Sequence, residues 1–274
     1  MEKKTKIKLL AIQIGSVIAD KRANEENVEK LLEKALSSQS ADFIFLPEVW
    51  NVGWDCPSFH SCAEEFENSS SLILLKKIAQ KYSVNIIGGS IIQKKADGSY
   101  ANTCPVIDRK GNLVCTYEKN HLFSYYGCNE GNYVNVGTTP VVVELEGVKF
   151  GLSICYDIRF PELYRAYRKA GADILVNVAA WGYEKRIPWV SMTTSRAVEN
   201  QAYFVALTQT GYLKDGNRNL GYSSIINYKG DILAEINELE GAFSAEIDLD
   251  EMYAFRDKCR VLDDIKNSYE VIIK

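Results

Sequence analysis

Residues 41–50 read ADFIFLPEVW, and residues 172–181 read ADILVNVAAW. In both stretches an Ala-Asp pair precedes a run of mainly apolar residues, and both stretches end in tryptophan. An Ala-Asp pair before an apolar run is common in α/β proteins and also arises by chance. Taken as a repeat, the two stretches predict two related β-α-β halves, each forming a sheet. Two such sheets packed face to face, with helices outside, form an α-β-β-α four-layer sandwich.

The rest of the chain alternates between strand and helix patterns around these two stretches. Helices are predicted at Asn24–Ser37, Ser71–Tyr82, Pro161–Ala170, Trp189–Asn200 and Leu249–Arg256. Strands are predicted at Lys6–Gly15, Asp42–Leu46, Asn85–Gln93, Asn102–Asp108, Leu113–Glu118, Pro140–Leu145, Val148–Cys155, Asp173–Val178, Tyr203–Gln209, Ser223–Asn227, Ile232–Ile236 and Ala242–Ile247. Turns predict three hairpins, at Asp97-Gly98, Lys110-Gly111 and Glu146-Gly147. Because hairpins occur beside βαβ units, both α/β sheets are expected to be mixed.

Length and composition favour a single domain spanning residues 1–274. Of the 274 residues, 46% are hydrophobic and 25% are charged, and no Pro-, Gly- or Ser-rich linker divides the chain. A net charge of -4 argues against a nucleic-acid-binding surface. No apolar stretch approaches the roughly 18 residues of a membrane helix. The short apolar run at residues 7–14 includes Lys8 and Gln13, which is typical of a strand and not of a signal peptide.

The cysteine and histidine content restricts the chemistry. Seven cysteines, none in a CxxC pair, together with no secretory signal, favour free thiols in a reducing cytoplasm. Only two histidines are present, His60 and His121, so a zinc site with several histidine ligands is excluded. A Ser-His or Cys-His dyad would have to use one of these two.

Three predicted strands end at residues with reactive or charged groups. Cys155 ends one strand, Glu48 follows another through Pro47, and Lys119 follows a third. Side chains at the C-terminal ends of strands open into the crevice where α/β proteins place their chemistry. Taken singly, a free cysteine is usually a core residue, and a strand-end glutamate or lysine is usually a solvated charge. Together the three residues supply a thiol, a base and a cation.

The motifs around these strand ends occur in the order of a known family. They are Leu46-Pro47-Glu48, Glu118-Lys119-Asn120-His121-Leu122-Phe123, Ile154-Cys155-Tyr156-Asp157-Ile158-Arg159-Phe160-Pro161-Glu162 and Ser195-Arg196-Ala197-Val198-Glu199-Asn200-Gln201-Ala202-Tyr203. From about Lys6 to about Asp248 the chain resembles the nitrilase superfamily of carbon–nitrogen hydrolases. Within it, the resemblance is greatest to the ω-amidase-type branch and its bacterial relatives.

The resemblance implies a Glu-Lys-Cys triad formed by Glu48, Lys119 and Cys155, with no cofactor and no metal. A thiol with a pKa of about 8.5 is mostly protonated at pH 7 and needs a base, which Glu48 supplies. Lys119 and the backbone N–H of Tyr156 are expected to stabilise the oxyanion. Glu130 corresponds to the second glutamate of the family, which supports the lysine and helps to position substrate. An ordinary loop acid is the alternative for Glu130.

Other residues are candidates for binding substrate or for supporting the scaffold. The aromatic candidates for the pocket wall are Trp181, Trp54, Tyr125 and Tyr126. Arg159 is a candidate for binding a substrate carboxylate, although local pairing with Asp157 is the commoner arrangement. Arg196 and Glu199 lie three residues apart on a predicted helix and are expected to stabilise the scaffold.

The implied activity is hydrolysis of a non-peptide carbon–nitrogen bond in a small amide, such as the ω-amide of a dicarboxylic acid. It proceeds through a cysteine thioester and releases ammonia. Nitrilase activity on R–C≡N and hydrolysis of N-carbamoyl amines are alternatives that use the same triad. A papain-like Cys155–His121 dyad is an alternative mechanism. A catalytically silent interaction subunit is the alternative of a different class.

The C-terminal residues 259–274 form a separate tail. Charged residues alternate there with the apolar residues Val261, Leu262, Ile265, Tyr269, Val271 and Ile272. Family members commonly form dimers, with this tail reaching toward the partner. We therefore expect a homodimer or higher homo-oligomer with the tail docked on a neighbouring subunit. The other expected partner is the small-molecule substrate, with neither nucleic acid nor membrane involved.

Overall fold

The computed structural model describes residues 4–125, 127–213, 216–266 and 268–273, and its strands form two mixed sheets. The first sheet contains β1 (Lys6–Gln13), β2 (Phe43–Phe45), β3 (Asn85–Ile87), β4 (Ile91–Lys94), β5 (Tyr100–Ile107), β6 (Leu113–Glu118) and β13 (Gly241–Asp248). The second sheet contains β7 (Val142–Leu145), β8 (Val148–Ile154), β9 (Ile174–Ala179), β10 (Tyr203–Thr208), β11 (Ser224–Ile226) and β12 (Ile232–Glu235).

Each sheet is built on three adjacent parallel strands. In the first sheet these are β1, β2 and β3, in the order β13-β1-β2-β3-β5-β4, with β6 paired to β5. In the second they are β8, β9 and β10, in the order β12-β11-β10-β9-β8-β7. The remaining pairs are antiparallel, which confirms the prediction of mixed sheets.

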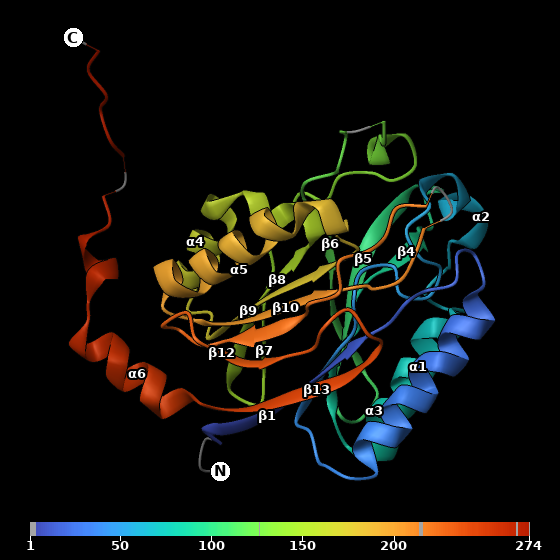
Figure 1. Ribbon diagram of the computed structural model, residues 1–274, viewed down its shortest axis with the longest axis horizontal. Helices are drawn as coiled ribbons and strands as arrows, with labels where there is room; N and C mark the ends of the chain where they lie inside the picture. The colour runs from blue at the N-terminus through green and yellow to red at the C-terminus, as the bar shows by residue number, and fades with distance from the viewer. Residues whose placement is uncertain (1–3, 126, 214–215, 267, 274) are drawn as a thin grey trace.

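Helices cover the outer face of each sheet (Figure 1). The helices are α1 (Lys21–Leu36), α2 (Phe59–Cys62), α3 (Ser70–Tyr82), α4 (Pro161–Lys169), α5 (Arg186–Asn200) and α6 (Leu249–Lys258). The pair α1 and α3 packs on the first sheet, and the pair α4 and α5 packs on the second, so the predicted α-β-β-α sandwich is confirmed. The described residues also form short 3-10 helices, at η1 (Cys56–Ser58), η2 (Glu130–Asn132), η3 (Cys155–Arg159), η4 (Tyr183–Lys185) and η5 (Val261–Asp264). In the described part of the chain, no helix is long and apolar enough to span a membrane.

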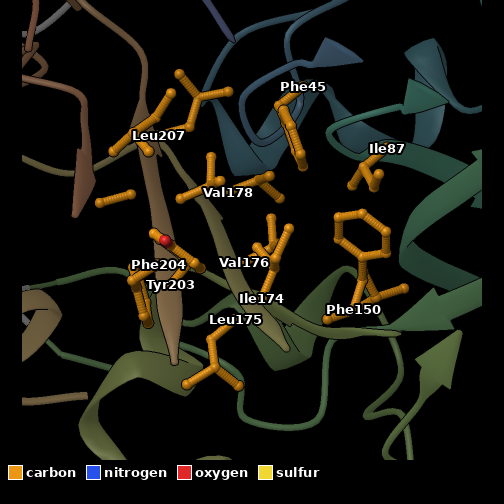
Figure 2. Close-up of a cluster of buried hydrophobic side chains, with 14 of the residues drawn as sticks. Phe45, Ile87, Phe150, Ile174, Leu175, Val176, Val178, Tyr203, Phe204 and Leu207 are labelled. Atoms are coloured by element: carbon orange, nitrogen blue, oxygen red, sulfur yellow. The ribbon is translucent and has the colours of Figure 1, made fainter. Parts of the chain in front are cut away.

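The alternation of side chains along the strands divides the core into layers. In β1, Leu9 and Ala11 join the apolar cluster between the two sheets, whereas Leu10 and Ile12 join the cluster under α1 and α3. Phe43 of β2 meets Phe150 of β8 across the sheets, with ring centroids 4.7 Å apart. Figure 2 shows part of this cluster, with Phe45, Ile87, Phe150, Val176 and Val178 between the sheets and Leu175 on the other side of β9.

The two repeated stretches occupy equivalent places in the two sheets. Residues 41–50 contain β2, and residues 172–181 contain β9. Each is the middle strand of its parallel trio, reached through one helix and left through another. The halves β1-α1-β2-α3-β3 and β8-α4-β9-α5-β10 therefore match, as the repeat predicts.

Several predicted boundaries shift for local reasons. Helix α1 begins at Lys21 and not at Asn24, because the Asp20 side chain caps it by accepting from the Ala23 N–H at 3.0 Å. Strand β8 ends at Ile154 and not at Cys155, because Cys155 has a left-handed φ of 46° and begins η3.

The strand predicted at Asn85–Gln93 is in fact two strands, β3 and β4, separated by residues 88–90. Gly89 has a φ of +65°, and a Cβ placed on it would lie 2.1 Å from the Pro47 carbonyl oxygen. Ser90 then holds the same loop, because its N–H donates to the Pro47 carbonyl and its Oγ accepts from the Val49 N–H. The break thus fixes the backbone on both sides of Glu48.

We predict that Gly89→Ala lowers the free energy of unfolding by more than about 2 kcal/mol, because the new Cβ clashes with backbone and the left-handed φ adds strain. Gly98→Ala is the matched control. Gly98 has a φ of +83°, but a Cβ added there would have no heavy atom within 4 Å, so this variant introduces the strain alone. Urea unfolding of both variants measures the difference, and equal losses in the two would contradict the proposed close packing.

Candidate active site

Glu48 is fully buried and bridges the two sheets. It follows β2 of the first sheet, and its Oε2 accepts from the backbone N–H of Ala180, directly after β9 of the second sheet, at 2.8 Å. Its Oε1 accepts from Lys119 Nζ at 2.8 Å. Its backbone carbonyl accepts from Gln209 Nε2 at 2.6 Å. The carboxylate is therefore held from both sides of the sandwich.

Lys119 is fully buried between two carboxylates. It follows β6, and its Nζ donates to Glu48 and to both oxygens of Glu130, at 2.9 and 3.1 Å. The ammonium also lies 4.9 Å from the ring centroid of Trp54, a cation–π distance. These contacts fix the ammonium in one position.

Glu130 is the first residue of η2 and is also fully buried. Besides Lys119, its carboxylate accepts from the backbone N–H of Phe123 at 2.8 Å, which closes the loop that leads to η2. Asn102 of β5 donates from Nδ2 to Glu48 at 2.9 Å and to Glu130 at 3.2 Å. The sequence did not lead us to predict Asn102. The one sign of it is a single amide side chain in the mainly apolar strand β5 (Tyr100–Ile107).

Cys155 lies on a sharp turn between β8 and η3. Its left-handed φ of 46° is rare for a residue with a side chain, and Val49, next to Glu48, has a similar φ of 40°. Strained backbone of this kind persists only where surrounding contacts hold it, and it clusters at functional sites. Both turns carry a residue of the predicted triad.

Asp157 holds the Cys155 turn. It is fully buried, and it accepts from the Ile154 N–H at 2.9 Å, from the Tyr117 hydroxyl at 2.6 Å and from the His121 N–H at 2.9 Å. His121 Nδ1 lies 2.7 Å from the same carboxylate. His121 thus pairs with Asp157, which leaves the Cys155–His121 dyad without support. The expected local pair of Asp157 with Arg159 is likewise replaced by these contacts.

Arg196 anchors η3 from α5. Its guanidinium donates to the Ile158 carbonyl at 3.0 and 3.2 Å and to Glu199 at 2.9 Å. The scaffold role predicted for Arg196 and Glu199 matches these contacts.

The buried charges shift the pKa of each triad residue. Burial raises the pKa of Glu48, Lys119 opposes that rise and Glu130 adds to it. Burial lowers the pKa of Lys119, but the two carboxylates outweigh it and hold the pKa well above its ordinary value. Burial and the charge of Glu48 raise the pKa of the Cys155 thiol well above its ordinary value, against the effect of Lys119. Burial first, and then the charge of Glu48, therefore favour the protonated form of the resting thiol.

A cavity of about 630 Å³ opens over Cys155. Its lining includes Trp54, Trp181 and Arg159, three of the predicted binding residues. The guanidinium of Arg159 lies over the Trp181 ring, 5.4 Å from the centroid. Its placement in the cavity, beside Cys155, favours substrate binding over the commoner local pairing with Asp157.

Tyr125 is placed differently from its prediction. It is 56% exposed and packs on the outer side of Phe123 and Tyr156, outside the cavity lining. The residues around Tyr125 in the sequence do not indicate that it lies on an exposed loop. Tyr126, the remaining aromatic candidate, lies outside the described residues.

Comparisons of this chain with known proteins all point to one family. The carbon-nitrogen hydrolase family model matches residues 8–257. A 2-oxoglutaramate amidase of Bacillus subtilis is 38% identical over 244 residues, covering 88% of this chain and 92% of the relative. The omega-amidase NIT3 of Saccharomyces cerevisiae is 29% identical, covering 92% of this chain and 90% of the relative.

Solved structures show the same fold. The crystal structure of Saccharomyces cerevisiae Nit3, described as a member of branch 10 of the nitrilase superfamily, superposes with a TM-score of 0.86 at 28% identity and covers 93% of this chain and 95% of that chain. With the family model spanning nearly the whole sandwich, this chain belongs to the carbon-nitrogen hydrolase family, within the nitrilase superfamily.

Proposed function

We propose that this protein is an amidase that hydrolyses the ω-amide of a small dicarboxylic acid through a thioester on Cys155. One observation carries the proposal: Cys155 lines the cavity while Glu48, Lys119 and Glu130 are buried together beside it. The relatives named 2-oxoglutaramate amidase and omega-amidase support an amide substrate that carries a carboxylate.

In the first half of the reaction, the Cys155 sulfur attacks the amide carbonyl carbon while Glu48 takes the thiol proton. Because the resting thiol is neutral, proton removal and attack occur together, with Glu48 as general base. The negative charge that develops on the carbonyl oxygen is stabilised by Lys119. The Tyr156 N–H is the second donor, as an early residue of η3 with no preceding helical turn to bond.

Collapse of the tetrahedral intermediate breaks the carbon–nitrogen bond. The leaving nitrogen takes the proton from Glu48 and departs as ammonia, which leaves a thioester on Cys155. Glu48, ionised again, removes a proton from the attacking water. The second collapse releases the carboxylic acid and restores the thiol. Each turnover consumes one amide and one water.

Arg159 and Trp181 are proposed to bind the substrate. A guanidinium pairs with a carboxylate in a bidentate manner, and the Trp181 ring beneath Arg159 restricts its rotation. A substrate with its amide at Cys155 and its carboxylate at Arg159 is a half-amide of a dicarboxylic acid.

We further propose that the chain forms one domain and acts as a cytoplasmic homodimer. The outer face of α5 exposes a stripe of apolar residues, with Ile187 79% exposed and Val190 and Val198 on the same side. The tail extends away from the sandwich (Figure 1), with its apolar residues Tyr269, Val271 and Ile272 exposed. A second copy that covers both surfaces would bury them. Seven free thiols suit a reducing compartment.

We predict that the wild type releases ammonia from succinamate and that Cys155→Ala does not. The panel pairs succinamate with 3-cyanopropanoate, N-carbamoyl-β-alanine and butyramide, so that nitrile, carbamoyl and neutral amide are tested on similar short carbon skeletons. Ammonia release and carbon dioxide are measured for each. Turnover of the nitrile alone would replace the amidase proposal, and full turnover by Cys155→Ala would overturn the mechanism.

We predict that Glu48→Gln lowers kcat by about 10² to 10⁴ because the amide cannot accept the thiol proton. Glu64→Gln is the matched control. Glu64 is also a buried carboxylate, but it bonds to Lys21 and Asn51 and not to Lys119. Steady-state kinetics and circular dichroism of both variants separate chemistry from folding. Similar losses of kcat in the two would argue against a base at Glu48.

We predict that Arg159→Met lowers kcat/KM for succinamate about tenfold to hundredfold, the loss expected for one charge-assisted hydrogen-bonding partner. The same variant should hydrolyse butyramide at nearly the wild-type rate, because butyramide has no carboxylate. Kinetics on the two substrates give the test. A parallel loss on butyramide would assign Arg159 to the structure of the site and not to carboxylate binding.

A further inference from the structure

Two thiols that the proposed reaction does not use lie side by side near the active site. Cys56 Sγ and Cys128 Sγ are 3.4 Å apart, although 72 residues separate them in the chain. Cys56 begins η1 and is buried, whereas Cys128 lies in the loop before η2 and is partly exposed. This contact brings together two segments that are distant in the sequence.

The pair is accessible from a second cavity. This cavity has a volume of about 320 Å³, and its lining includes both Cys56 and Cys128, together with Trp54 and Leu213. Trp54 and Leu213 also line the cavity over Cys155, so the two cavities share a wall. Cys128 lines this cavity and is partly exposed, so its sulfur is the one that a small disulfide would reach first.

The two thiols differ in acidity. A hydrogen bond from Cys56 lowers the pKa of Cys128, against the effect of burial, whereas the pKa of Cys56 is raised. Cys128 is therefore the better attacking group, since the thiolate is the nucleophile in disulfide exchange.

Each thiol is close in sequence to a residue that holds Lys119. Cys128 precedes Glu130 by two positions, and Glu130 accepts two hydrogen bonds from the ammonium. Cys56 follows Trp54 by two positions, and the Trp54 ring lies against the same ammonium. A movement of either thiol would therefore act on the backbone two residues from a side chain that contacts Lys119.

We propose that Cys56 and Cys128 form a redox-sensitive dithiol, which closes to a disulfide on exchange with a small-molecule disulfide and thereby slows amide hydrolysis. The thiolate of Cys128 attacks one sulfur of the small disulfide and expels one thiolate. Cys56, losing its proton, then attacks the Cys128 sulfur of the mixed disulfide and expels the second thiolate. The protein loses two electrons and two protons, and the small disulfide becomes two thiols. The effect on hydrolysis rests on the proposed function, but formation of the disulfide does not.

Closure requires the two sulfurs to approach by about 1.4 Å, from 3.4 Å to the bond length of about 2.05 Å. Cys128 is the less buried of the two thiols, so we expect the loop that carries it to make this movement. That movement shifts Glu130 or Trp54 relative to Lys119. A misplacement of about 1 Å in a catalytic group lowers rate by up to about 10²-fold.

The test compares the full-length wild type with Cys128→Ser and with Cys259→Ser, a matched control that removes a partly buried thiol from the far end of the chain. Each protein is equilibrated with glutathione disulfide and then with dithiothreitol. Peptide mapping by mass spectrometry locates disulfides, and succinamate turnover is measured in parallel. We expect a Cys56–Cys128 link and a loss of turnover of at least tenfold in the wild type and in Cys259→Ser, both reversed by dithiothreitol.

Cys128→Ser should form no such link and should keep its turnover under the same oxidation, which excludes oxidation of Cys155 as the cause. Cys56→Ser serves as a second variant if Cys128→Ser does not fold. Absence of the Cys56–Cys128 link in the wild type would overturn the proposal, and a link that leaves turnover unchanged would overturn its regulatory part. If the reduced wild type turns over no amide, the proposed function fails while the mapped link still tests the dithiol.

Discussion

A buried ammonium between two buried carboxylates is the interaction on which the site depends. Lys119 alone would be costly to bury, and so would Glu48 or Glu130, because each charge loses its hydration. Together they compensate one another, and Asn102 bonds to both carboxylates. Lys119 is the member that the group can least lose, since its removal would leave two buried carboxylates without a cation. This explains why four polar side chains occupy a volume that could otherwise be filled by apolar packing.

The excess negative charge of this group also determines how the thiol reacts. Burial and the charge of Glu48 both disfavour a thiolate at Cys155 and raise the pKa of its thiol, although Lys119 opposes them. A standing thiolate would react with many electrophiles and oxidants. Under the proposed mechanism, a neutral thiol next to a base of raised pKa would react mainly when the carbonyl is in place. The same charge group would then both protect the nucleophile and activate it.

Much of the fold followed from the sequence because it depends on local patterns. The repeat around β2 and β9, the hairpin turns and the strand-end positions of Glu48, Lys119 and Cys155 are all visible in short windows. The features that escaped prediction depend on contacts between distant segments. Gly89 breaks a strand because its backbone passes Pro47, and Asp157 turns away from Arg159 because Tyr117 and His121 approach it from another strand. The turn at Cys155, with its left-handed backbone, is likewise held by a distant residue, since Arg196 of α5 donates to the Ile158 carbonyl.

The hydrogen bond from Ala180 to Glu48 makes the position of the Glu48 carboxylate depend on how the two sheets lie relative to each other. It joins the end of β9 to the end of β2, so the proposed base is held by both sheets, as it also is through the bond from Gln209 to the Glu48 carbonyl. Apolar contacts permit small sliding movements at little cost, whereas a hydrogen bond of 2.8 Å does not. A shift of one sheet against the other would lengthen this hydrogen bond and move the Glu48 carboxylate relative to Lys119. Under the proposed mechanism, the rate of hydrolysis then reports whether the two halves of the sandwich keep their relative position.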